Sequence, residues 1–226
     1  DDIFVKALGF GDKGEVYAGS YGRGFWVKEK GKDWEGRNRG IYNSNILTMA
    51  FSDKGEMFAG TKQGLYISAK GDDNWIEVSG LYGMKVNAFL VDGKQVYAGT
   101  SNGLFIGSAS EKGWKRVDGD IGYMPVTSLA RVGNFVYAGT DSDGIFRGET
   151  GKGGFKAMND GLENFRVNGT CAENFEPSCL RTSSASFAAA DDTRDVNFSA
   201  GFCKGEETWS KTQGGFFTEH LLRECG

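Results

Sequence analysis

The apolar residues of the chain fall into short runs that are separated by polar turns containing glycine. The clearest unit begins with VNAFLV at 86–91, turns at Asp92-Gly93 and continues with QVYAGT at 95–100. Two further apolar runs follow at 104–107 and 114–117. Runs rich in β-branched and aromatic residues, joined by hairpin-length turns, predict four antiparallel strands in one meander.

Three other stretches of the chain have the same order of runs and turns. Their first strands are predicted to contain residues 4–8, 46–50 and 126–130. The last strand of every unit opens with an aromatic residue, and these residues are Trp34, Trp75, Trp114 and Phe155. A helical repeat of similar length would show a periodicity of about 3.6 residues and few internal glycines, so it is not favoured.

A four-residue phrase marks the second strand of each unit. It reads YAGS at 17–20, FAGT at 58–61 and YAGT at 97–100 and 137–140, in steps of 41, 39 and 40 residues. A period of about 40 residues is typical of four-stranded propeller blades. The chain is therefore predicted to be an all-β, incomplete β-propeller. The four complete blades are expected at about 3–40, 41–81, 82–121 and 122–162, with the start of a fifth at 165.

The small residues of the phrase have a steric explanation. Inner strands crowd around the axis of a propeller, where Ala and Gly permit close approach of the backbones. The Ser or Thr hydroxyl that ends the phrase can satisfy a neighbouring backbone group. We favour this interpretation over a role in ligand binding, because a functional residue is expected in one blade rather than in all of them.

The repeat resembles the propeller repeats of the Asp-box (BNR-like) and photosystem II assembly-factor-like group. The resemblance rests on the VYAGT-x-x-G-L/I-F pair of runs that begins at Val96, on a degenerate G-x-x-W turn and on G-L/I pairs at 40–41, 80–81 and 161–162. It is also similar to the sensor propellers of two-component regulators, and it covers about residues 3–165. Residues 68–75 (SAKGDDNW) and 28–34 (KEKGKDW) depart from the Ser-x-Asp-x-Gly order of the Asp-box turn.

The same resemblance includes sialidases, which implies a hydrolytic propeller as an alternative function. Residues 165–168 read FRVN, an echo of the sialidase FRIP segment that lacks its proline. In an alignment of the repeats, Val167 takes the place of Val86 and Val126, which favours the opening strand of a fifth blade instead. Paired carboxylates are required for glycoside hydrolysis, but the acidic residues here lie at variable turn positions. No catalytic residue is assigned.

Composition changes near residue 170 and predicts two regions, 1–173 and 174–226. All four cysteines (Cys171, Cys179, Cys203 and Cys225) follow residue 170, and their spacings of 8, 24 and 22 match no zinc pattern. Reduced buried thiols are favoured over two disulfides, which would require export, and the sequons at 168–170 and 197–199 are compatible with export. A secreted or periplasmic location is favoured over a cytoplasmic one, and no metal or cofactor is expected.

The second region contains a run of small residues at 184–190, an acidic segment at 191–195 and an amphipathic stretch at 214–225. These predict a strand and a short helix. Their order is similar to the closing strand and helix of caspase-like (metacaspase) peptidases over about 45 residues. That resemblance implies a fragment of a peptidase without its catalytic half, since such enzymes need a histidine base and a cysteine nucleophile on earlier strands. An extension that covers an open propeller edge is the other interpretation.

Charge and hydropathy narrow the range of partners. The net charge is −4, and basic residues are interspersed with acidic ones. No basic stripe suits a phosphate backbone, and no apolar run reaches the length of about 18 residues that a spanning helix needs. We therefore expect no nucleic-acid partner and no membrane insertion. The start of the chain has neither a methionine nor a signal-peptide pattern, so a cut end is expected there.

Strand alternation places a candidate binding surface. In an up-and-down meander, the loop between the second and third strands emerges on the same face as the linker to the next blade. Variable polar residues on these loops, and a near-regular series of tyrosines on the linkers, could form a recognition surface. From sequence alone we favour the alternative that each linker tyrosine packs between blades. The candidate residues are Tyr21, Arg23, Tyr42, Lys62, Gln63, Tyr82, Ser101, Asn102, Tyr123, Asp141 and Asp143.

The function predicted from these observations is a non-catalytic recognition or scaffold module. It would bind a protein or carbohydrate ligand through loops on one face of the propeller. An enzyme, either a hydrolytic propeller or a fragment of a propeller-linked peptidase, is the alternative.

Overall fold

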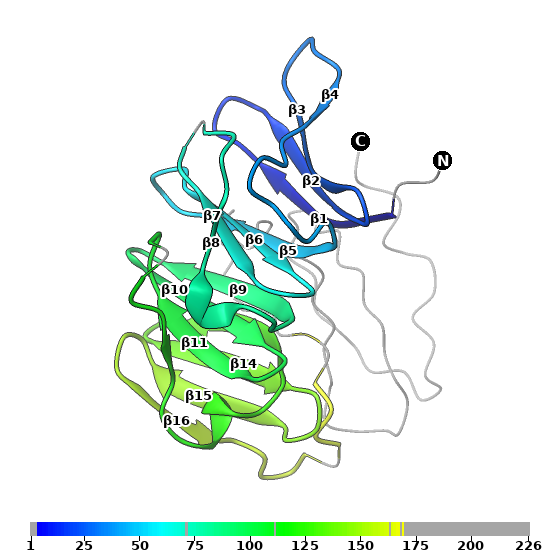
Figure 1. Cartoon of the computed structure of the whole chain (residues 1–226). Coiled ribbons are helices and arrows are strands. Elements are labelled where there is room, and N and C mark those ends of the chain that lie inside the picture. Colours follow the sequence, from blue (N-terminus) through cyan, green and yellow to red (C-terminus); the bar gives the residue numbers. More distant parts are fainter. Residues whose placement is uncertain (1–3, 71, 111, 163, 168, 170–226) are drawn as a thin grey trace, which may run out of the picture.

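The computed structural model describes residues 4–70, 72–110, 112–162, 164–167 and 169. These residues form four antiparallel four-stranded sheets, each a meander of strands consecutive in sequence (Figure 1). Blade 1 contains β1 (Phe4–Phe10), β2 (Val16–Tyr21), β3 (Gly24–Lys28) and β4 (Trp34–Gly36), and blade 2 contains β5 (Ile46–Phe51), β6 (Met57–Thr61), β7 (Leu65–Ser68) and β8 (Ile76–Glu77). Blade 3 contains β9 (Val86–Asp92), β10 (Gln95–Thr100), β11 (Gly103–Gly107) and β12 (Lys115–Arg116), and blade 4 contains β13 (Val126–Val132), β14 (Phe135–Thr140), β15 (Ile145–Glu149) and β16 (Gly153–Ala157).

The blades follow one another from blade 1 at the top of Figure 1 to blade 4 at the bottom, and their first strands β1, β5, β9 and β13 lie against one another in that order. Short 3-10 helices, η1 (Ser79–Leu81) and η2 (Asp120–Gly122), lie in two of the linkers between blades. The predicted all-β, incomplete propeller with four complete blades is confirmed. The strand expected at 184–190 and the helix expected at 214–225 lie outside the described residues.

The glycine of each repeated phrase forms the contact between neighbouring blades. A Cβ built on Gly60 would lie 2.8 Å from Cγ1 of Val86 in the next blade, and one on Gly99 would lie 2.6 Å from Cγ1 of Val126. A Cβ built on Gly19 would likewise lie 2.5 Å from Cγ2 of Ile46. The three apolar side chains are completely buried, so they have little room to move away. The steric explanation of the phrase is confirmed.

Val167 makes the same contact after blade 4. A Cβ on Gly139 would lie 2.5 Å from Cγ1 of Val167, whose side chain is 4% exposed, and the Val167 amide donates a hydrogen bond to the Thr140 carbonyl at 2.9 Å. Each first strand also carries a register shift near this position, and the Asn87 side chain there donates from Nδ2 to the Val126 carbonyl at 2.8 Å. The Thr127 hydroxyl reaches the Val167 carbonyl in the same way. Val167 therefore occupies the position that opens a blade.

The opposite end of the array is uncovered by described residues. Val5 pairs with Ser20 in the register in which Ile46 pairs with Thr61, and Leu8 corresponds to Met49. The exposed fractions of Val5 and Leu8 are 48% and 53%, whereas those of Ile46 and Met49 are 0% and 3%. An open arrangement with an exposed terminal face, expected from the number of blades, is present at blade 1.

Three apolar clusters fill the spaces between successive blades. In the cluster between blades 1 and 2, Trp75 packs edge-on against Phe25, with ring centroids 4.7 Å apart. Its indole Nε1 donates to the Arg37 carbonyl at 2.9 Å, and its amide donates to the Arg39 carbonyl at 2.8 Å. This aromatic residue at the start of a last strand thus fixes the preceding linker as well as filling the core.

The hydroxyl that ends each phrase fixes the loop that follows it. The side chains of Ser20, Thr61, Thr100 and Thr140 are completely buried. Thr100 Oγ1 donates to the Gly103 carbonyl at 2.8 Å and accepts a hydrogen bond from the Asn102 amide at 3.0 Å. The other three donate to the carbonyls of Gly24, Gly64 and Gly144 at 2.9, 3.0 and 2.8 Å. The predicted role of the hydroxyl is confirmed in every blade.

We expect Gly99→Ala to destabilise the protein by about 1–3 kcal/mol, because the new methyl group overlaps the buried Val126 side chain. Denaturant unfolding measures the change, and Val126→Ala in the same chain should restore part of it. Gly80→Ala is the matched control, since a Cβ there meets nothing within 4 Å, and it should change the free energy of unfolding by less than about 0.5 kcal/mol. Equal effects of the two alanines would contradict the packing argument.

Thr100→Val should lower the free energy of unfolding by about 1–2 kcal/mol, because the Gly103 carbonyl and the Asn102 amide lose their partner. Thr150→Val provides the control, since the Thr150 hydroxyl is buried without a hydrogen-bond partner in the described structure. That change should be neutral or stabilising. The pair of variants separates loss of a hydrogen bond from loss of a hydroxyl.

Candidate functional site

The loops after the phrase and the linkers between blades are joined by backbone hydrogen bonds. The Gly83 amide donates to the Gln63 carbonyl at 2.9 Å, and the Ser101 amide donates to the Lys85 carbonyl at 2.8 Å. Equivalent bonds join Gly24 to Ser44 at 2.9 Å, Asp141 to Pro125 at 3.1 Å and Gly144 to Phe165 at 2.8 Å. Loops and linkers therefore share one edge of the blades, as strand alternation predicted. We call this edge the rim.

The linker tyrosines point outward from the rim. The exposed fractions of Tyr42, Tyr82 and Tyr123 are 87%, 69% and 71%. These values contradict the interpretation that the tyrosines pack between blades. The apolar residues that do fill those spaces, such as Leu81 and Ile121, precede Tyr82 and Tyr123 by one or two positions.

A fourth aromatic residue continues the series and was missed from sequence. Phe165 lies 42 residues after Tyr123, whereas the tyrosines are 40 and 41 residues apart, and its side chain is 45% exposed. The spacing was a sufficient signal to find it. The prediction of a fifth-blade strand at this segment rested on Val167 alone. The repeat spacing predicts both residues, because Phe165 continues the tyrosine series and Val167 continues the series of Val86 and Val126.

Cations already lie over two aromatic rings of the rim. Lys62 Nζ lies 4.7 Å from the ring centroid of Tyr21 and is hydrogen-bonded to its hydroxyl. The Arg116 guanidinium lies 4.7 Å from the centroids of both Phe105 and Tyr123. These contacts restrict the orientation of Tyr21 and Tyr123 without burying them.

Arg116 is a second residue that sequence reasoning missed. Its Nη1 donates to the carbonyls of Asn102 and Gly122, so it joins the β10–β11 loop to η2. The sequence contained no signal for this role, because Arg116 stands on a last strand at a position whose repeat partners are different residues. In blade 3, Arg116 lies over the rings of Phe105 and Tyr123 and donates to the carbonyls of Asn102 and Gly122.

The remaining candidate residues form short polar contacts along the rim. Gln63 Oε1 accepts from Asn43 Nδ2 at 3.2 Å, and Ser101 Oγ accepts from the Lys85 amide at 3.2 Å. Asp141 Oδ1 accepts from Arg166 Nε at 3.2 Å. Arg23 accepts a hydrogen bond from Trp26 Nε1 through its carbonyl at 2.9 Å. All eleven candidates thus lie on the loops and linkers of one rim.

An open groove of about 520 Å³ lies at the blade 4 end of the rim. Its apolar surface includes Met124, Phe146, Phe155 and Phe165, and its charged residues are Asp120, Asp143 and Lys156. Asp143 is a predicted site residue, while the others were not predicted. We call this feature the blade 4 groove.

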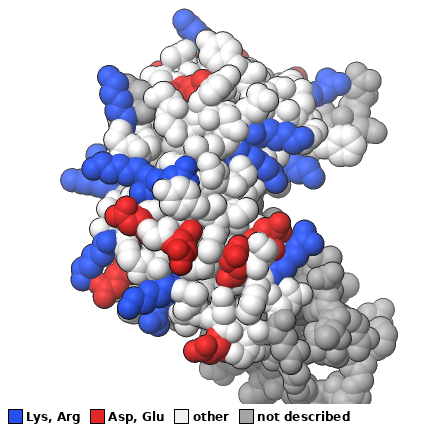
Figure 2. All heavy atoms as spheres, turned by 60° about the horizontal axis from the view of Figure 1, so that its bottom comes forward, with Lys and Arg blue, Asp and Glu red and all other residues white. Residues whose placement is uncertain are grey.

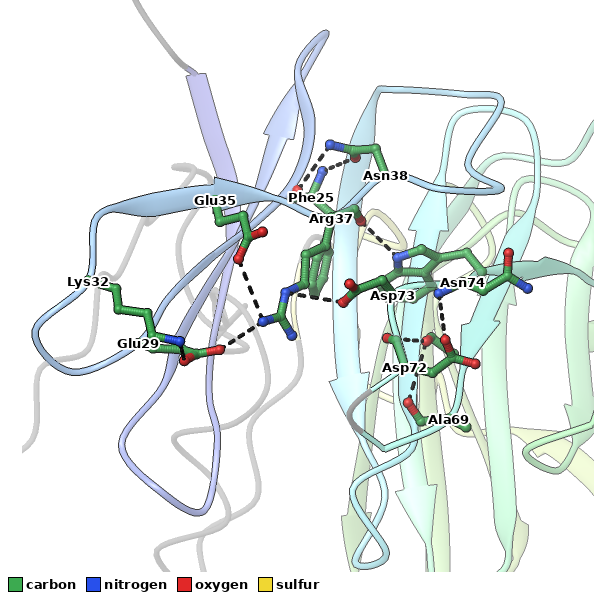
Figure 3. A network of polar contacts seen from close by, with 12 residues as sticks. Phe25, Glu29, Lys32, Glu35, Arg37, Asn38, Ala69, Asp72, Asp73 and Asn74 are labelled. Carbon is green, nitrogen blue, oxygen red and sulfur yellow. Dashed lines mark hydrogen bonds and ion pairs between the residues drawn. The ribbon is translucent and has the colours of Figure 1, made fainter.

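A polar network around Arg37 lies between blades 1 and 2 (Figure 3). Arg37 Nη2 is 2.8 Å from Glu29 Oε1, and Arg37 Nε is 3.3 Å from Asp73 Oδ1 in the next blade. A hydrogen bond and ion pair with Lys32 at 2.6 Å, followed by the weaker effect of Arg37, lower the pKa of the Glu29 carboxyl. The network joins the two blades through the ion pair between Arg37 and Asp73.

Two carboxyl groups in the described part of the chain have pKa values held below the ordinary range by neighbouring lysines. Hydrogen bonding and ion pairing with Lys152 lower the pKa of Glu149, as those with Lys32 lower the pKa of Glu29. Among the described residues, no group of three or more His, Cys, Asp or Glu side chains could hold a metal ion. None of the described helices is long and apolar enough to cross a membrane. Basic and acidic side chains are interspersed on the face that Figure 2 shows.

The hydroxyl of Tyr66 lies beneath the rim and donates to Glu77 Oε1 at 2.9 Å. Burial, with a smaller effect of Glu77, raises the pKa of Tyr66 to about 12, and the backbone amides of Tyr42 and Asn43 oppose the shift. The contribution of Tyr66 to stability is therefore present below pH 10 and is lost as pH rises from 10 to about 12.

We expect Tyr66→Phe to reduce this pH dependence of the free energy of unfolding, and to remove the last tyrosine to ionise in an absorbance titration.

No protein-family profile and no curated protein matches the chain. Solved structures do match it, and the three described next share 15–18% sequence identity with the chain. The extracellular domain of the putative hybrid two component system BT4673 from B. thetaiotaomicron aligns with a TM-score of 0.60 and 18% identity, over 73% of this chain and 24% of that one. PorZ, a surface component of the type-IX secretion system of Porphyromonas gingivalis, aligns with a TM-score of 0.55 and 15% identity, over 70% and 23%. YCF48 bound to D1 peptide aligns at a TM-score of 0.48 and 18% identity, over 59% and 47%.

The likeness to the first two structures concerns the fold. The chain spans about a quarter of the length of each. The expected similarity to the sensor propellers of two-component regulators is confirmed at this level. The Asp-box assignment has no matching family to support it.

Proposed function

We propose that the chain is a non-catalytic propeller module that recognises a protein ligand through the rim. The observation that carries the proposal is the series of exposed aromatic residues, one on each linker: Tyr42, Tyr82, Tyr123 and Phe165. Large exposed rings on a rigid scaffold give contact area at a small cost in side-chain entropy. The hydrogen bonds between loops and linkers supply the rigid scaffold.

The arrangement of the series favours an extended ligand. The four rings come from four successive linkers, so a ligand that touches all of them crosses every described blade. Polar side chains that differ from blade to blade, such as Lys62, Asn102 and Asp141, stand beside the rings and would supply specificity. An extended stretch of polypeptide suits this row of contacts.

A carbohydrate is the second candidate ligand. The exposed rings of Tyr82 and Tyr123 also suit the apolar faces of sugars, and polar residues of the neighbouring loops, such as Gln63 and Asn102, suit their hydroxyls. We propose binding rather than either enzymatic alternative, because a series of exposed aromatic rings on a rigid scaffold is typical of recognition surfaces. The segment 174–226, which we propose to be separate from a propeller region at 1–173, carries the peptidase resemblance and lies outside the described residues.

The location we propose is outside the cytoplasm. The structures with similar folds include an extracellular domain and a bacterial surface component. Both of these proteins support a secreted or periplasmic setting, in which the cysteines after residue 170 could form disulfides.

A triple variant, Tyr42→Ala with Tyr82→Ala and Tyr123→Ala, tests the proposal. A displayed library of random peptides and an array of glycans are first screened with the unmodified chain. The triple variant should bind the selected peptides at least about tenfold more weakly, because exposed aromatic contacts dominate such interfaces. Its melting temperature should change little, since the three side chains are largely exposed.

Trp34→Ala with Ile76→Ala serves as the control, because both side chains are exposed on last strands away from the rim, at 45% and 50%. This control should bind the peptides normally. Selection of glycans alone would favour the carbohydrate candidate. Unchanged peptide binding by the triple variant would overturn the proposal.

A further inference from the structure

We propose that the blade 4 groove binds an arginine side chain of the protein ligand. The inference rests on the proposed function and specifies the chemistry of the partner at one point of the rim. The groove, at about 520 Å³, is within the usual size range of ligand sites.

The apolar side of the groove is aromatic. Phe146 and Phe155 belong to the core between blades 3 and 4, where they are 5% and 8% exposed, and Met124 packs against the same cluster. Phe165 is 45% exposed at the groove. The aliphatic stem of an arginine suits such a surface, and its guanidinium group suits the face of a phenylalanine ring.

Two carboxylates supply the charge complementarity. Asp120 comes from η2 and Asp143 from the β14–β15 loop, and within the described residues neither forms an ion pair. The Ser142 hydroxyl donates to Asp143 Oδ2 at 2.9 Å and leaves the carboxylate charge unneutralised. Lys156 also lines the groove, so its three charged groups carry a net charge of −1. A cationic ligand is therefore favoured.

Two aromatic rings of the rim show that it can hold a cation against a ring face. Lys62 lies over Tyr21 and Arg116 lies over Tyr123, each cation 4.7 Å from the ring centroid. Among the described residues, no cation lies over the rings of Tyr42, Tyr82 or Phe165, and of these three only Phe165 lines the groove with its carboxylates. The adjacent Arg166 is paired with Asp141 at 3.2 Å. An external cation at Phe165 would repeat the contact that the protein makes internally at Tyr21 and Tyr123.

The walls of the groove are held before any ligand binds. The Asp143 amide donates to Thr140 Oγ1 at 2.9 Å, and Asn159 Nδ2 donates to the Asp143 carbonyl at 2.9 Å. The Gly144 amide donates to the Phe165 carbonyl at 2.8 Å, which joins the two sides. Pre-organised walls reduce the entropic cost of binding. A planar guanidinium can stack on the ring while it donates to carboxylates, which favours arginine over lysine.

Titration of the full, isotopically labelled chain with N-acetyl-arginine methylamide tests the inference by NMR. We expect saturable amide shifts at 142–144, 120–124 and 159 at concentrations up to about 10 mM. The citrulline analogue, which has nearly the same shape but no charge, should produce no such shifts. Raised salt should weaken the arginine response, because the attraction is partly exposed to solvent.

The variant Asp120→Asn with Asp143→Asn should weaken arginine binding at least about fivefold, and Phe165→Leu should weaken it to a smaller extent. Asp53→Asn, which removes an exposed carboxylate from the β5–β6 turn, should leave it unchanged. Unchanged amide spectra away from the substituted residues verify that each variant folds.

Three results would overturn the inference: no arginine-dependent shifts, equal shifts with citrulline, or equal shifts in the double carboxylate variant. Shifts at the same residues with methyl β-glucoside would assign the groove to a carbohydrate instead. The probe is a small molecule, so the outcome is independent of whether the triple tyrosine variant loses peptide binding. Failure of the proposed function and failure of this inference are therefore distinguishable.

Discussion

The structure depends on the insertion of a β-branched side chain of one blade against the glycine of the preceding blade. The pairs are Gly19 with Ile46, Gly60 with Val86, Gly99 with Val126 and Gly139 with Val167. A methyl group on any of these glycines would lie 2.8 Å or less from the partner side chain, which is well inside contact distance. The spacing of the sheets follows from this contact, because an alanine would have to push a whole blade outward. The rim is fixed as a consequence, since its loops begin two or three residues after each glycine.

The two ends of the described array differ in how they meet this requirement. At blade 4, the Val167 side chain fills the position beside Gly139, and the Val167 carbonyl accepts a hydrogen bond from the Thr127 hydroxyl. Val167 therefore covers β14 at Gly139. At blade 1, Val5 and Leu8 occupy the positions that Ile46 and Met49 occupy in blade 2, and their side chains are about half exposed. Among the described residues, blade 1 is held by its own hairpins and by the packing of Gly19 against Ile46 of blade 2.

Sequence reasoning found most of what is repeated, with Phe165 in the aromatic series as the exception. The strands, their turns, the close contact at glycine and the buried hydroxyl recur in every blade, so each had four independent indications. The direction of the linker tyrosines could not be found this way, because a residue repeated every 40 positions can face the core or the solvent equally well. Arg116 and the blade 4 groove were also out of reach, since each depends on side chains that one blade alone brings together. Periodicity predicts the scaffold, and the departures from it create the candidate site.

The division between repeated and variable residues explains how one rim can carry different charges along its length. In each loop the buried hydroxyl fixes the backbone, so the neighbouring side chains are free to differ without loss of the turn. Blades 1 and 2 present Arg23 and Lys62, whereas blade 4 presents Asp141 and Asp143 beside Asp120 on the linker. The ligand proposed above would meet Arg23 and Lys62 at one end of the rim and, at the other, the three carboxylates together with Lys156 and with Arg166, which is paired with Asp141. Such complementarity determines the direction in which a ligand binds more than its affinity, so the aromatic series would supply the contact and the unequal loops would supply the orientation.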